Sequence, residues 1–279
     1  MPDPRLTKLA KILVHYSLEI QPGQQFAIET HPWAEELTLA VYEEAIQAGA
    51  HAVILTSTPG AREIFFKHAS DAQLDHISPI ARLVNESFDA SLDIWTEHNT
   101  RSLSGIDPRR MARASRARAP MLKATLERMA RKELRWCGTS FPTHASAQEA
   151  DMSLADYREF VFAAGLLNEE DPVAFWKKAG QEQQKLADWL KGRQQVVLNG
   201  SNVDLKLSIQ ERIFIPCDGK ENFPDGEIFT GPVEDSVNGW IRFTYPAIEG
   251  GREVEGVELV ENCFEVVDPS SCANHRLRR

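Results

Sequence analysis

The chain has 279 residues, of which 42% are apolar and 26% charged, values typical of soluble globular proteins. It carries 31 Lys and Arg against 41 Asp and Glu, and the resulting net charge of −10 disfavours binding to nucleic acid or anionic membranes. No apolar run approaches the roughly 18 residues that a membrane span needs, and the first residues lack a secretory signal pattern. We therefore expect a cytoplasmic protein with one large or two ordinary domains.

Strand and helix signals alternate in the first half of the chain. Apolar residues at helical spacing run from Leu6 to Leu18 and end before a Pro-Gly turn. Short apolar strands are predicted at 26–30 and 52–55, with a helix that begins near Pro32 between them. Such a strand–helix–strand unit normally makes parallel sheet.

Further strands are predicted at 90–95 and 134–138. The basic stretch between them has helical character, and we expect Pro120 to break or kink it. Residues 154–189 are predicted to be helical around a break at Asp171 and Pro172, with their Phe and Trp side chains in the core.

From Gln195 onward the pattern changes to short runs with alternating polarity. These runs predict strands at 195–198, 203–209, 212–215, 240–245 and 257–260. The predicted fold class is therefore α/β, with an N-terminal α/β domain of residues 1–192 that contains a largely parallel sheet. An incomplete β-rich (α+β) C-terminal domain of residues 193–279 follows it.

The basic stretch from Arg109 to Arg135 holds ten Lys or Arg against two Glu. The stretch has no aromatic residues interleaved with its basic residues and no nucleic-acid-binding motif. A solvated helix face or a positive wall beside a cleft is the favoured interpretation, and a nucleic-acid site is the alternative.

Most standard catalytic and metal-binding motifs are absent. His68 and His76 stand eight residues apart, which on a helix is too far for one metal ion. The four cysteines contain no Cys-x-x-Cys pair, so reduced thiols are favoured over a zinc site built from Cys263, Cys272 and His275.

One segment of unusual composition runs from Asn222 to Pro232 with the sequence Asn-Phe-Pro-Asp-Gly-Glu-Ile-Phe-Thr-Gly-Pro. Its glycine precedes a single acid, Glu227, and a short apolar run follows. This order predicts a carboxylate held at a stiff turn where the chain enters a strand.

This segment resembles the metal-site signature of the M29 metallo-aminopeptidases, the thermophilic leucyl aminopeptidase family. The family pattern is roughly Asn-Ile/Met-Pro-x-Gly-Glu-Val-Phe-Thr-x-Pro. Residues 200–205, residues 237–239 and the opening strand–helix–strand unit are also similar to the family. The resemblance covers about residues 5 to 260.

The resemblance implies a two-domain hydrolase that removes N-terminal residues from peptides with a two-metal site in its C-terminal domain. In the family the Glu of this motif bridges two divalent ions, with zinc or cobalt expected, so Glu227 is the expected metal ligand. The resemblance also implies peptide substrates and a homodimer. No catalytic or substrate-binding residue can be assigned from it.

The family's other ligands, a second Glu, a His, a Tyr and a His-x-Asp pair, have no counterparts in the chain. Two metal ions need several anionic and imidazole ligands. We therefore expect a C-terminally truncated family member that is inactive as this chain. The alternative is a non-catalytic binding or scaffold remnant of such a peptidase.

Overall fold

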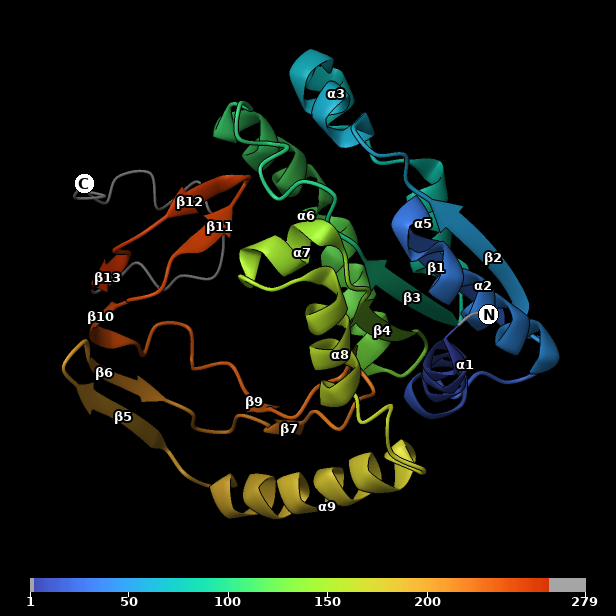
Figure 1. Cartoon of the computed structure of the whole chain (residues 1–279). Coiled ribbons are helices and arrows are strands. Elements are labelled where there is room, and N and C mark those ends of the chain that lie inside the picture. The colour runs from blue at the N-terminus through green and yellow to red at the C-terminus, as the bar shows by residue number, and fades with distance from the viewer. Residues whose placement is uncertain (1–2, 261–279) are drawn as a thin grey trace.

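The structure is a computed structural model that describes residues 3–260 (Figure 1). The candidate zinc ligands Cys263, Cys272 and His275 lie outside the described residues. No helix among residues 3–260 combines the length and the apolar character needed to cross a membrane.

A five-stranded parallel sheet forms the centre of the first half of the molecule. Its strands are β1 (Gln25–Thr30), β2 (His51–Thr56), β3 (Ala90–Trp95), β4 (Arg135–Ser140) and β8 (Asn222–Phe223). They lie in the order β2-β1-β3-β4-β8, and every neighbouring pair is parallel. This arrangement confirms the predicted α/β fold, and its last strand comes from the later part of the chain.

Helices cover both faces of this sheet because successive strand residues point to opposite sides. On one face, Phe26 and Ile28 of β1 join the largest core with α1 (Pro4–Lys11), its π-helical continuation (Ile12–Ser17) and α2 (Glu35–Gln47). A short 3-10 turn (Pro32–Ala34) precedes α2. On the other face, Ala27 packs with Val84 and Phe88 from α5 (Pro79–Ser87) and its end.

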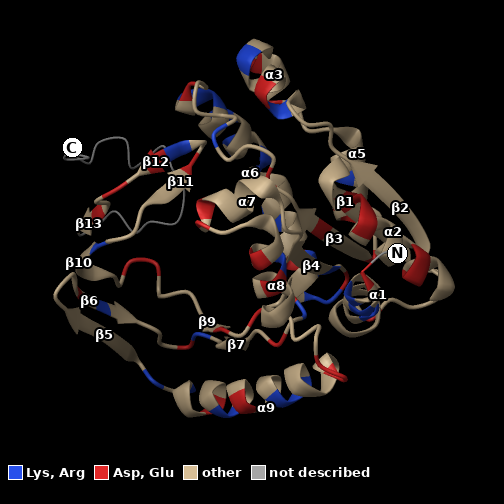
Figure 2. Ribbon diagram, in the orientation of Figure 1, with Lys and Arg blue, Asp and Glu red and all other residues tan. Residues whose placement is uncertain are grey.

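The basic stretch forms one helix, α6 (Pro108–Ala130), with Pro120 inside it (Figures 1 and 2). The expectation that Pro120 breaks the helix is therefore wrong, and a kink at Pro120 stays a prediction. Contacts hold α6 on both sides of the proline. Before it, Arg113 pairs with Asp75 at 2.6 Å, just after α4 (Asp71–Leu74). After it, Arg128 donates to the carbonyl of Asn85 at 2.6 Å. These anchors compensate for the hydrogen bond that proline removes.

Several basic side chains of α6 therefore bind neighbouring elements of the fold. Arg110 donates to the Phe66 carbonyl in α3 (Ala61–His68), and Arg113 also pairs with Asp71 in α4 (Asp71–Leu74). Part of the basic charge of α6 is therefore used in contacts with other elements of the fold.

Three helices follow β4: α7 (His144–Glu149), α8 (Leu154–Ala164) and α9 (Pro172–Leu190). The expectation that all their aromatic side chains are core is wrong in part. Phe162 and Trp176 are buried, whereas Phe160, Phe175 and Trp189 are each more than half exposed. Each helix packs one face only, and helical spacing turns the remaining aromatic residues outward.

The later part of the chain is β-rich, as predicted, and its strands other than β8 pair antiparallel. One sheet has the order β13 (Glu258–Val260), β10 (Asn238–Arg242), β6 (Val203–Ser208), β5 (Gln195–Gly200). Two small ribbons pair β7 (Ile215–Pro216) with β9 (Ile228–Phe229) and β11 (Ala247–Glu249) with β12 (Arg252–Val254). The strand predicted at 212–215 is present only from Ile215.

These strands extend in an arc from the end of α9 back toward α6 (Figure 1). The β11–β12 ribbon closes the arc, because Arg252 donates to the carbonyls of Ser104 and Ile106 just before α6. Arg101 also pairs with Glu253 at 2.8 Å.

Strand β8 anchors this later part to the parallel sheet. The Gly138 amide donates to the Glu221 carbonyl at 2.8 Å, and the Thr139 hydroxyl donates to the Phe223 carbonyl at 2.7 Å. The Phe223 side chain is 1% exposed and packs edge-on against Trp176 of α9.

Replacing Phe223 with Ala should lower the free energy of unfolding by about 3–5 kcal/mol, because the change leaves a cavity where sheet and helix meet. Urea unfolding followed by circular dichroism measures this loss. Phe229→Ala, at a 44% exposed position six residues away, is the matched control and should cost less than about 1 kcal/mol. Equal losses in the two variants would contradict the anchoring role of β8.

A pair of acids lies where the strand order reverses between β1 and β3. Glu29 and Asp93 are opposite each other in the parallel register, so both side chains point to the same face. Burial raises the pKa of both carboxyl groups, and the Asp93 charge raises the pKa of Glu29 further. The Trp136 indole donates to Asp93 at 2.7 Å.

A raised folded-state pKa means that the stabilising contribution of Glu29 is present at low pH and is lost as pH rises. The wild type should therefore lose stability relative to Glu29→Gln between about pH 4 and pH 7. Unfolding free energies of both proteins across this range test the sign. A difference between wild type and Glu29→Gln that stays constant across this range would refute the assignment.

Candidate metal centre

The turn that carries Glu227 lies between β8 and β9. Gly226 has a φ of +135°, which side-chain-bearing residues rarely adopt. The carboxylate of Asp225 accepts a hydrogen bond from the Gly226 amide at 2.9 Å through Oδ1. Glu227 stands directly before β9, as the sequence pattern predicts for a carboxylate at a turn that enters a strand.

A second chain segment brings a thiol to this turn. Cys217 follows β7, which pairs with β9, and its amide donates to the Glu227 carbonyl at 2.9 Å. From α9, the Gln183 side-chain amide donates to the carbonyls of both Cys217 and Glu227, at 3.1 and 3.0 Å. One buried glutamine therefore holds the two segments in register.

Three potential metal-ligating atoms meet here, one each from Cys217, Asp225 and Glu227, and all lie within 4.8 Å of one another. Cys217 is buried, Asp225 is half-buried and Glu227 is exposed. Within residues 3–260 no other group of three such side chains is this close. A thiol and two carboxylates are donor types that zinc accepts.

Negative charge is concentrated around the thiol. Burial, together with the charges of Asp225, Glu221 and Glu227, raises the pKa of Cys217 to about 12. Burial also raises the pKa of Glu221. Such an environment disfavours a further anion and favours a cation.

The residues present therefore fit one divalent ion. Two ions about 3.5–4 Å apart need several more ligands than three. The part of the chain that the structure describes supplies no second group for them.

Sequence reasoning named Glu227 but missed Cys217, Asp225 and Gln183. Asp225 lies in the same motif, two residues before Glu227, so the sequence alone could have indicated that the two carboxylates are close together. Cys217 and Gln183 reach the site only through the β7–β9 pairing and the packing of α9, for which the sequence carries no local signal.

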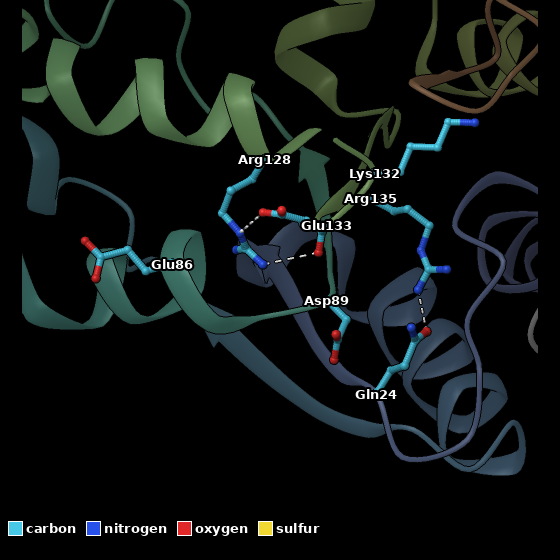
Figure 3. Close-up of a pocket in the computed structure, with 7 residues that line it drawn as sticks. All are labelled: Gln24, Glu86, Asp89, Arg128, Lys132, Glu133 and Arg135. Atoms are coloured by element: carbon cyan, nitrogen blue, oxygen red, sulfur yellow. Dashed lines mark hydrogen bonds and ion pairs between the residues drawn. The ribbon is translucent and has the colours of Figure 1, made fainter. Parts of the chain in front are cut away.

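A cavity lies elsewhere, at the amino ends of β1, β3 and β4 (Figure 3). It has a volume of about 470 Å³ and is lined by Gln24, Glu86, Asp89, Arg128, Lys132, Glu133 and Arg135. Arg128 points to Glu133 and Arg135 to Gln24, so several of its charges are already paired (Figure 3). Open α/β sheets bind ligands at the opposite, carboxyl edge. This cavity is therefore not the candidate centre.

The fold and the donor group together define an α/β protein whose β-rich part carries a candidate metal centre. The family model described as "Thermophilic metalloprotease (M29)" matches residues 2–272. The chain therefore belongs to the M29 metalloprotease family.

Named relatives agree with this membership. Aminopeptidase 2 of Geobacillus stearothermophilus is 25% identical over 96% of this chain and 70% of its own length. Aminopeptidase T of Thermus thermophilus is 25% identical over 90% of this chain and 67% of its own length. The solved structure of wild-type AmpT from Thermus thermophilus superposes with a TM-score of 0.72 at 21% identity, covering 91% of this chain and 68% of that chain. This likeness confirms the fold.

Replacing Gln183 with Leu should lower the free energy of unfolding by about 1–3 kcal/mol, because the buried Cys217 carbonyl loses its side-chain donor. Thermal or urea unfolding measures the loss. The neighbouring Gln184 is exposed, and Gln184→Leu should stay within about 0.5 kcal/mol of wild type. A Gln183→Leu protein as stable as the Gln184→Leu control would show that Gln183 does not hold the two segments.

Proposed function

We propose that the protein is a metal-dependent aminopeptidase by lineage, a hydrolase that releases N-terminal residues from peptides. The observation that carries this proposal is the position of Glu227, which lies with two further donors at a turn of the family's metal motif. The family membership and the names of the relatives support it.

The residues of this chain have defined roles under the proposal. Cys217, Asp225 and Glu227 would hold the ion, and Gln183 would fix the backbone of the first and last of them. A divalent ion, when bound, polarises a carbonyl and lowers the pKa of water. The surplus carboxylate charge at this turn would also attract the ammonium group of a peptide N-terminus.

We further propose that the 279-residue chain by itself has little or no peptidase activity. The support is chemical, because the described donors suffice for one ion whereas the expected family mechanism uses two. Zinc or cobalt is the proposed metal, since a thiol and carboxylates suit both.

A binding or scaffold role is the second candidate, and the exposed apolar side chains favour it. Phe160, Phe175 and Trp189 on α8 and α9 and Val197 on β5 are large apolar residues that face solvent. Contact with a partner, or with a second copy of the chain in a homodimer, would remove these apolar side chains from water. A cytoplasmic location and a domain boundary near residue 192 also stay proposals. Across the proposed boundary, β8 of the later domain pairs with β4 in the sheet of the first domain.

A peptidase assay with unblocked and N-acetylated peptides, with added Zn²⁺ or Co²⁺ or with chelator, tests the first proposal. We expect metal-dependent release from unblocked peptides only, with kcat below about 1 s⁻¹, the low end of the ordinary range. Glu227→Gln should abolish this release, and the exposed control Glu249→Gln should retain it.

Cleavage of acetylated peptides, or release that resists chelation, would contradict an aminopeptidase. A kcat well inside the ordinary range of about 1–10³ s⁻¹ would contradict the proposed loss of activity. No detectable release under any condition would agree with the proposed loss of activity and would leave the binding role as the function of this chain.

A further inference from the structure

We propose that Cys217 is a metal ligand, and that its thiolate binds a single thiophilic divalent ion together with the carboxylates of Asp225 and Glu227. The proposal rests on the proposed function only in that Glu227 is shared. It differs from an all-carboxylate and imidazole site because it places sulfur on the ion.

The spacing of the three donors fits one ion. Zinc binds thiolate sulfur at about 2.3 Å and carboxylate oxygen at about 2.0–2.2 Å, so two ligands of a tetrahedral ion lie about 3.5 Å apart. The three donor atoms lie within 4.8 Å of one another.

Unsatisfied acceptors on Asp225 and on two residues outside the turn, Glu221 and Gln183, provide a second, independent observation. Oδ1 of Asp225 accepts from the Gly226 amide, but Oδ2 is buried and has no hydrogen-bond partner. Oε2 of Glu221 and Oε1 of Gln183, a residue only 8% exposed, are also buried without partners. Buried acceptors without donors are unfavourable, and a cation removes this penalty at a carboxylate.

The surroundings of Cys217 differ from those of an ordinary core cysteine. Its Sγ has one weak contact, with the Ile215 carbonyl at 3.8 Å, and it faces two carboxylates. Cys137 is equally buried but belongs to the main hydrophobic core and to no such donor group. A buried thiol beside two carboxylates is a donor set that a cation would stabilise.

The donor types predict which ion binds. Thiolate sulfur favours zinc or cobalt over magnesium and calcium, which prefer oxygen ligands. Because Glu227 is exposed, the ion can enter from solvent, and three protein ligands leave a fourth position open.

Titration of the metal-free, reduced 279-residue chain with Co²⁺ tests the proposal, since thiolate–cobalt bonds give charge-transfer absorption in the near ultraviolet. We expect saturation at one equivalent in the wild type. Cys217→Ser should lose the band, and Asp225→Asn should weaken binding at least tenfold. Cys137→Ser and the double variant Cys263→Ser/Cys272→Ser should keep both band and stoichiometry. Circular dichroism establishes that each variant is folded.

A wild type without the band, or a band that survives in Cys217→Ser, would overturn the proposal. A band lost only in the double variant would place the sulfur ligand at Cys263 or Cys272 and would also overturn it.

The peptidase assay separates the two proposals. Chelator-sensitive activity that persists in Cys217→Ser would leave the proposed function standing without the thiolate. The band together with cleavage of acetylated peptides, or with release that resists chelation, would leave the thiolate site standing without the function.

Discussion

The short pairing of β8 with β4 is the constraint on which the candidate site depends. It adds residues Asn222 and Phe223 to a parallel sheet built by the first 140 residues, and Phe223 is buried between that sheet and α9. The turn with Asp225 and Glu227 begins two residues later. The part of the chain that is paired with the sheet therefore ends almost at the candidate metal-ligating side chains.

The same helix that packs on Phe223 also completes the site from the other side. Trp176 of α9 contacts Phe223, and Gln183, two helical turns further along, holds the carbonyls of Cys217 and Glu227. Buried contacts thus fix the backbone of Cys217 and Glu227, while the side chain of Glu227 remains accessible to solvent. This combination suits a centre that must be preorganised and yet admit an ion.

The sequence predicted much of this structure where the signal was local. Alternating strand and helix patterns gave the parallel sheet, and the Gly-Glu motif located Glu227 at a turn before a strand. Prediction from the sequence failed where contacts between distant parts of the chain decide the local structure. Pro120 does not interrupt α6 because Arg113 and Arg128 anchor the helix on either side. Cys217 gave no signal because only the β7–β9 pairing brings it to Glu227.

The most direct test of a one-ion centre at Cys217, Asp225 and Glu227 is X-ray absorption of the chain loaded with one equivalent of zinc. The account predicts one sulfur neighbour at about 2.3 Å and oxygen neighbours at about 2.0–2.2 Å, with no second zinc nearby. A zinc environment made of oxygen and nitrogen alone, or a zinc–zinc distance of about 3.5–4 Å, would contradict it.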